Sequence, residues 1–120
     1  MTEEQIKKIE WLNRARLADE DRQVMEAVSE KDEYIRKSLG ISDTDSKREL
    51  KVKAAEVAAY REEIKLAIEK IENEQYKKIL KMRYLAYMKM DDIADALHKE
   101  LRTVQRNHKK AIDAVAITNA

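Results

Sequence analysis

The chain has only one residue that would end a helix sharply, Gly40, and it has no proline at all. Glycine and proline supply the turn conformations that β-sandwiches, barrels and glycine-rich phosphate loops need. Charged residues make up 41% of the sequence, and apolar residues recur between them at spacings of three and four. Such a pattern is typical of long amphipathic helices. The sequence therefore predicts an all-α protein.

Gly40 separates two long predicted helices, 3–39 and 47–72. Each has one apolar stripe, and the first stripe is interrupted between Asn13 and Glu20, where we expect looser packing. Neither helix can bury its stripe alone, so we expect an antiparallel helical hairpin or, alternatively, a coiled coil with a second chain. The first stripe consists of Ile6, Ile9, Leu17, Val24, Ala27, Val28, Ile35 and Leu39, and the second of Leu50, Val57, Ile64, Ile68 and Ile71.

The polar stretch 42–46 is the expected loop of this hairpin. Ser46 or Asp45 is expected to cap the second helix, because short polar side chains accept hydrogen bonds from the first free backbone N–H groups. Trp11 lies off the main stripe of the first helix. The sequence leaves open whether it packs on the second helix, marks a partner surface or is partly exposed.

A third predicted helix, 74–88, begins after a capping residue, Asn73. Arg83 falls on its apolar side, and we expect this side chain to form an ion pair with an acid such as Asp92 in preference to the alternative, a direct contact with DNA. The helix should support the elements that follow it. Its predicted buried residues are Tyr76, Ile79, Leu80, Tyr84 and Tyr87.

A short helix, a three-residue turn and a longer helix, about 101–116, are predicted after Lys89. Ile93, Ala94 and Leu97 share one stripe of the short helix, and the small Ala94 allows a second helix to cross closely. The longer helix has an apolar back and a cationic front, as a helix-turn-helix DNA-binding unit requires. Its predicted apolar stripe is Leu101, Val104, His108, Ala111 and Val115.

Eight residues of this unit are candidates for contact with DNA. The half of a recognition helix nearest the turn usually reads base edges. Arginine there can pair with guanine, and glutamine can pair with adenine. Lysines farther along the helix and at its flanks fit phosphate contacts, which position the protein without reading sequence. The base-reading candidates are Arg102, Thr103, Gln105 and Arg106, and the phosphate candidates are Lys109, Lys110, Lys99 and Lys89.

The charge of the chain is unevenly distributed. Residues 1–73 contain 15 Lys and Arg against 18 Asp and Glu, whereas residues 74–120 contain 10 against 6. Between Leu101 and Ile112, four residues are basic and none is acidic. Clustered positive charge on one helix favours a nucleic-acid partner.

The stretch from Ile79 to Ile112, with ILKMRYL, MDDIADAL and RTVQRNHKKAI, resembles region 4 of bacterial sigma factors. With its N-terminal helices included, the chain resembles the ArpU/RinA-type regulators of phages and prophages. The resemblance is specific over about the last 45 residues and is limited to the helical architecture before them. The resemblance implies a helix-turn-helix that reads promoter DNA and contacts RNA polymerase. His98 departs from the family pattern, which usually has glycine at this turn position because the residue there adopts a left-handed conformation.

Several classes of protein are disfavoured. There is no cysteine, hence no disulfide or thiolate metal site, and the two histidines, His98 and His108, have no metal-ligand spacing. His98 is expected to be a turn residue, and His108 a hydrogen-bonded, half-buried side chain. No nucleophile–base pair is recognisable, so we expect no enzyme, no cofactor and no metal. No apolar run could cross a membrane, and we expect a protein of the host bacterial cytoplasm.

We therefore predict a sequence-specific DNA-binding transcriptional regulator in two parts. Residues 1–72 form the hairpin, which should mediate homodimerisation or partner binding, and residues 73–120 form the DNA-binding unit. This division predicts that 73–120 keeps its three helices when produced alone. Two alternatives remain: a small-terminase-like DNA-packaging subunit that uses the same unit within a ring, and a helical adaptor that does not bind DNA.

Overall fold

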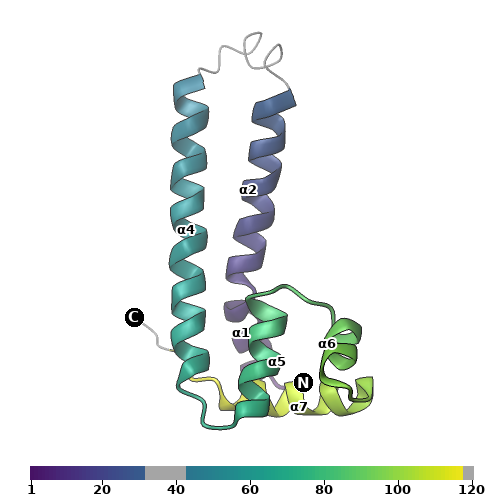
Figure 1. The fold of residues 1–120 in the computed structure, drawn as a ribbon. Coiled ribbons are helices and arrows are strands. Elements are labelled where there is room, and N and C mark those ends of the chain that lie inside the picture. Colours follow the sequence, from purple (N-terminus) through teal and green to yellow (C-terminus); the bar gives the residue numbers. More distant parts are fainter. Residues whose placement is uncertain (32–42, 118–120) are drawn as a thin grey trace.

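A computed structural model describes residues 1–31 and 43–117 of the chain, and in these residues all regular secondary structure is helical (Figure 1). The all-α class is thus confirmed. The helices are α1 (Glu3–Leu12), α2 (Arg14–Lys31), α4 (Asp43–Glu69), α5 (Glu74–Tyr84), α6 (Met90–Leu97) and α7 (Leu101–Ala114). No helix in this part of the chain combines the length and the apolar character needed to cross a bilayer.

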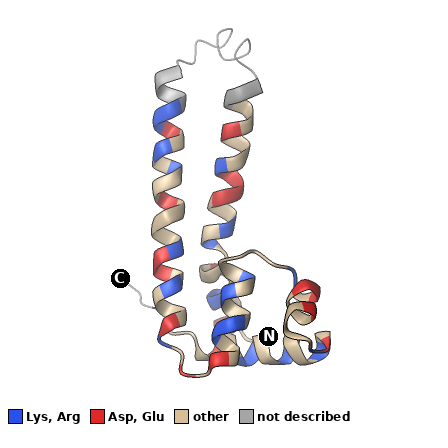
Figure 2. Cartoon of the chain, in the orientation of Figure 1, with Lys and Arg blue, Asp and Glu red and all other residues tan. Residues whose placement is uncertain are grey.

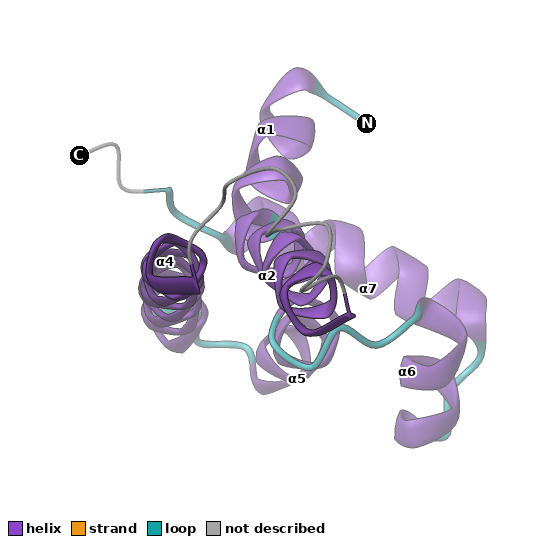
Figure 3. Cartoon of the chain, turned by 90° about the horizontal axis from the view of Figure 1, so that it is seen from above, coloured by secondary structure: helices purple, strands orange, loops and turns teal. Residues whose placement is uncertain are grey.

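Helices α2 and α4 lie side by side along most of their lengths (Figures 1 and 3). The predicted stripe of α4 is confirmed, because Val57, Ile64 and Ile68 are buried and Leu50 is half-buried. The predicted start of α4 at residue 47 was wrong. The helix starts at Asp43, so the expected capping positions 45 and 46 lie inside it. The expected Gly40 loop lies outside the described residues.

The predicted stripe of the first helix was wrong. The helix is broken at Asn13, where α1 ends and α2 begins in a different direction (Figure 3). As a result α1 packs on α7 while α2 packs on α4, and one straight stripe cannot face both. Ile6, Leu17, Val24 and Val28 are 45–63% exposed. The buried residues around the break are instead Leu12, Ala15 and Ala18, so packing there is tight. Ile35 and Leu39 lie outside the described residues.

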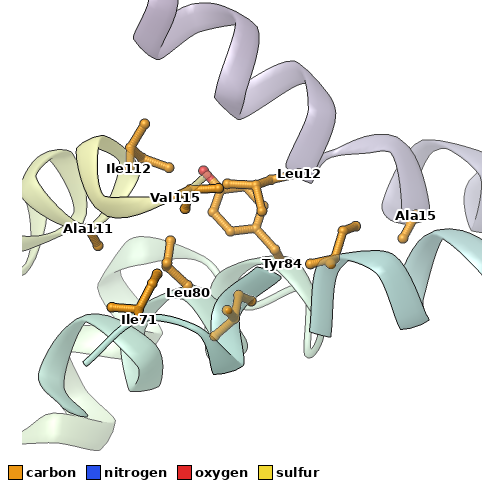
Figure 4. Close-up of a cluster of buried hydrophobic side chains, with 10 residues drawn as sticks. Leu12, Ala15, Ile71, Leu80, Tyr84, Ala111, Ile112 and Val115 are labelled. Atoms are coloured by element: carbon orange, nitrogen blue, oxygen red, sulfur yellow. The ribbon is translucent and has the colours of Figure 1, made fainter. Parts of the chain in front are cut away.

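One core joins the N-terminal helices to the C-terminal ones (Figure 4). Leu12 from α1 and Ile71, just after α4, meet Leu80 and Tyr84 from α5 and Ile112 from α7. All five side chains are at most 6% exposed. The core therefore continues across the boundary that the sequence placed at residue 73.

A second, smaller cluster positions α6 and α7 against α5. It consists of Ile79, Ile93, Ala94 and Val104, all nearly inaccessible to solvent. Helix α5 begins after Asn73 as predicted, with the Asn73 side chain accepting hydrogen bonds from the N–H groups of residues 75 and 76. It ends at Tyr84 rather than at residue 88. Tyr87 has a φ of 60°, and this left-handed conformation reverses the chain toward α6.

Candidate nucleic-acid interface

The outer face of α7 is formed by polar and cationic side chains. Val104, His108, Ala111, Ile112 and Val115 are buried, so the helix packs through the predicted back, extended by Ile112. Leu101, predicted on that stripe, is 37% exposed because it lies at the first turn, beside the interhelical turn. Five of the predicted DNA-contact residues of α7 are exposed, and Thr103 is half-buried at the edge. The exposed residues are Arg102, Gln105, Arg106, Lys109 and Lys110.

From Leu101 to Ile112, α7 carries four cations and no acid, whereas the long helices carry both signs along their lengths. Arg22 pairs with Asp19 and Glu26, Lys53 with Asp21 and Glu56, and Lys81 with Glu69, so the long helices mix both signs along their length (Figure 2). Among the side chains that the structure describes, in residues 1–28 and 47–117, no acid forms an ion pair with the four cations of α7, which are Arg102, Arg106, Lys109 and Lys110. Their charge is therefore not neutralised by acids of this part of the molecule.

The turn between α6 and α7 is fixed by backbone hydrogen bonds. His98 adopts the left-handed conformation expected for it, with φ 53° and ψ 45°. Its N–H donates to the carbonyl of Asp95, and the N–H of Lys99 donates to the carbonyl of Ala94 at 3.0 Å. These two bonds form a Schellman motif, which satisfies carbonyls at the end of α6 and sets the direction of α7.

Two arginines hold the segment between α5 and α6. Arg83 donates to the backbone carbonyl of Met88 at 2.9 Å, so the expected ion pair with Asp92 was wrong. Arg61, on α4, donates to the carbonyl of Leu85 and to the hydroxyl of Tyr87, at 2.9 and 2.8 Å. No local signal in the sequence identifies Arg61, because its two hydrogen-bond partners lie 24 and 26 residues away and one of them is a backbone carbonyl. Both arginines position α6, and through it the turn.

The far end of α7 is held by α1. Gln5 is buried; it completes a capping box with Thr2 and also donates to the carboxylate of Asp113 at 2.8 Å. Lys8 donates to the backbone carbonyl of Asp113. The only sequence signal for this role was the Thr2–Gln5 spacing of a capping box. These contacts fix α7 at the end opposite the turn.

His108 lies directly behind the exposed face of α7. Its Nε2 and the hydroxyl of Tyr84 share a hydrogen bond of 2.7 Å, and the two rings stack. The predicted hydrogen bond of His108 is confirmed, but the side chain is buried rather than half-buried, with an exposure of 7%. Burial, with the nearby charge of Arg83, lowers the pKa of His108 to about 4. Burial also raises the pKa of Tyr84 to about 12. Both side chains are therefore neutral near pH 7.

Lys99 and Lys89 are exposed at opposite ends of α6. Lys99 is in the turn, where its ammonium donates to the side chain of Gln75 on α5 at 3.2 Å. Lys89 is the residue before α6, about 12 Å from the turn at 1.5 Å per residue. Between them, α6 exposes Asp91, Asp92 and Asp95, and Figure 2 shows acidic segments, in red, on this helix. Exposed acids of α6 thus lie between Lys89 and the turn, and in the turn the exposed Glu100 lies between Lys99 and the cations of α7.

Trp11 packs at the junction of α1, α2 and α4. The guanidinium of Arg14 lies 4.7 Å from the Trp11 ring centre and 4.6 Å from that of Tyr60, and it also pairs with Glu63. Trp11 is partly exposed, one of the three roles left open, and its link to the second long helix runs through Arg14, which lies between its ring and that of Tyr60. In the described part of the chain, no three histidine or acidic side chains are grouped so that they could hold a metal ion.

Comparison with known proteins gives one match. Residues 44–116, which cover nearly all of α4 and the whole of α5, α6 and α7, match the model of DUF1492, described as a protein of unknown function. No curated protein and no solved structure matches the chain. Because the matched segment is more than half of the 120 residues, the chain belongs to the DUF1492 family.

Proposed function

We propose that the chain is a sequence-specific DNA-binding regulator of transcription that inserts α7 into the major groove. The observation that carries this proposal is the exposed face of α7, where four cations project without an acidic partner among the described residues. A cationic helix of 14 residues, preceded by a short helix and a three-residue turn, has the dimensions of a recognition helix.

Within this proposal, the two ends of α7 have different tasks. Arg102, Thr103, Gln105 and Arg106 are in the first two turns and read base edges. Lys109 and Lys110 contact phosphates, and Lys99 adds a further phosphate contact from the turn. Lys89 contributes least, because the acids of α6 separate it from the basic surface.

The resemblance to ArpU/RinA-type regulators and to sigma region 4 refines the proposal. It favours a phage or prophage protein, without enzymatic activity, that binds promoter DNA and contacts RNA polymerase in the bacterial cytoplasm. The helical pair α2–α4 then serves self-association into a homodimer or the contact with polymerase.

The direct test is a titration of the full chain with duplex DNA at several salt concentrations. If four to six phosphates are contacted per protomer, log K should fall with log salt at a slope of about −4 to −5. Arg102→Ala with Arg106→Ala should weaken binding strongly. The matched control, Lys65→Ala with Lys70→Ala, removes one exposed cation from α4 and one just after it, and should change binding little. A slope near zero, or equal losses in the two double variants, would contradict the proposal.

Selection of bound sequences from a random DNA library tests the specificity. Enrichment of a promoter-like motif that disappears in Arg106→Ala is the expected result. Enrichment of one site near packaging genes would favour a terminase-like protein instead, and lack of any enrichment would favour an adaptor.

A further inference from the structure

The outer face of α7 ends in an acid. Asp113 is exposed, and it lies four residues after Lys109 and three after Lys110. Residues at these spacings are neighbours on the surface of a helix, and an acid and a base placed in this way commonly form an ion pair. Such a pair would neutralise a cation that the proposed function assigns to a DNA phosphate.

In the structure, the carboxylate of Asp113 is directed elsewhere. Its Oδ1 accepts a hydrogen bond of 2.8 Å from the side-chain amide of Gln5, which reaches it from α1. No ion pair joins Asp113 to Lys109 or Lys110, although the structure describes all three side chains. The two lysines therefore keep their charge available on the outer face.

The orientation of the Gln5 amide is fixed by both of its partners. Its Oε1 accepts from the backbone N–H of Thr2 at 3.0 Å, and its Nε2 donates to Asp113. A backbone N–H only donates and a carboxylate only accepts, so a flipped amide would satisfy neither partner. Gln5 is also buried, so little water can replace either bond.

Helix α1 is held on α7 by other contacts as well. Leu12 is buried in the core that α1 shares with α7, and Ile9 packs against the same core. Lys8 donates from its ammonium group to the backbone carbonyl of Asp113 at 3.1 Å, where a cation also interacts favourably with the end of α7. The Gln5 amide can therefore be removed while α1 keeps its place.

We propose that Gln5 is a positioning residue for DNA binding, because its amide holds the Asp113 carboxylate toward α1 and keeps it from pairing with Lys109 and Lys110. The inference rests on the proposed function, which assigns these two lysines to phosphates. It adds that a side chain 108 residues away in the sequence sets the affinity of the recognition helix.

A double-mutant cycle on the full chain tests this role by titration with duplex DNA at about 50 mM salt, where exposed charges are weakly screened. Gln5→Met keeps the length and the neutrality of the side chain but removes the donor. It should weaken DNA binding by about threefold, since an ion pair at this spacing is modest, and the ratio should shrink at higher salt. Asp113→Asn in the Gln5→Met chain should restore at least the wild-type affinity, whereas Asp113→Asn alone should have a smaller effect.

Thr2→Ala is the matched control. It removes the hydroxyl that accepts from the N–H of Gln5 at 3.2 Å, so it weakens the same capping box, but it keeps the hydrogen bond to Asp113. This variant should lower the thermal stability and leave the DNA affinity unchanged.

Gln5→Glu is a second variant that preserves the fold of α1. Glutamate is a usual residue at this position of a capping box, but its carboxylate repels that of Asp113 instead of donating to it. Asp113→Asn should therefore raise the DNA affinity more in the Gln5→Glu chain than in the wild type.

Equal effects of Asp113→Asn in the wild-type and Gln5-substituted chains would overturn the inference, because removing the acid does not repair a loss caused by packing alone. So would a Thr2→Ala chain that loses as much DNA affinity as Gln5→Met. A wild-type chain that binds no duplex DNA would instead reject the proposed function, and this inference with it. The wild-type titration thus distinguishes the two failures.

Discussion

Behind the basic face of α7, Tyr84 and His108 form a buried pair. This pair makes the stability of the folded chain depend on pH. The pKa of His108 is about 4 in the folded chain, against about 6.5 when it is exposed. Between these two pH values the unfolded chain binds a proton that the folded chain does not, so stability falls as the pH falls. Above about pH 6.5 the contribution of His108 is fully present.

We predict that this single residue removes about 2 kcal/mol of stability between pH 7.5 and pH 5. Urea unfolding of the wild-type chain and of His108→Gln at both pH values measures the difference. His98→Asn is the matched control, because it removes the other histidine of the chain, which is exposed. If His108→Gln loses as much stability as the wild type over this range, the buried neutral histidine is not the cause.

The left-handed residue in the turn is a second prediction at this scale. A non-glycine residue with a φ of 53° costs about 1–2 kcal/mol, partly offset by the greater freedom of glycine in the unfolded chain. His98→Gly should therefore stabilise the protein by about 0.5–1 kcal/mol. Tyr87→Gly relieves a similar φ of 60° but loses the hydrogen bond to Arg61, so it should not stabilise. Thermal unfolding of the two variants gives the comparison, and an unchanged or lower Tm for His98→Gly would refute the strain argument.

At the scale of elements, α7 was the helix that the sequence described best. Its hydrophobic side and its cationic side are both local properties, because residues three and four apart share a face whatever the helix packs against. The left-handed turn before it was also expected, because the resemblance indicated glycine at position 98. The outer face of α7 nevertheless combines two kinds of residue, and the proposed function assigns them different tasks.

Arg106→Ala and Lys110→Ala distinguish these tasks. Arg106→Ala should cost about 1–3 kcal/mol on the selected site and relax the preference at one base pair. Lys110→Ala should weaken all duplexes about equally and reduce the salt slope by about one. Fluorescence titrations with the selected duplex and a scrambled one provide the comparison. Equal behaviour of the two variants across both duplexes would remove the division between base reading and phosphate contact.

At the scale of the whole molecule, the shared core decides which parts can fold alone. Leu12, Ile64, Ile68 and Ile71 are at most 6% exposed and belong to the same cluster as Leu80, Tyr84 and Ile112. Burial of four such aliphatic side chains is worth about 6–12 kcal/mol, comparable with the total stability of a small domain. The stability of the three C-terminal helices thus depends on the first 72 residues.

We therefore predict, against the expectation from the sequence, that a chain beginning at Asn73 is largely unfolded. Far-ultraviolet circular dichroism should show little helix and no cooperative thermal transition. In the full chain, Ile68→Ala should cost about 2–5 kcal/mol, while Val52→Ala, at a residue 64% exposed, should cost much less. A stable three-helix fragment would show that the core across residue 73 is dispensable.

The sequence by itself determined the helical class, the stripe of α4, the capping at Asn73 and the two faces of α7. All of these follow from composition and from periodicity within one segment. The tertiary structure decided what depends on distant partners. The break at Asn13 lets α1 meet α7, and the buried face of α2 consequently falls on Ala15 and Ala18 instead of Leu17 and Val24. Arg61 likewise donates to the backbone carbonyl of Leu85, 24 residues away, which only the fold brings close. A helix carries its periodicity in its own sequence, but which of several apolar stripes is buried depends on which neighbour packs against it.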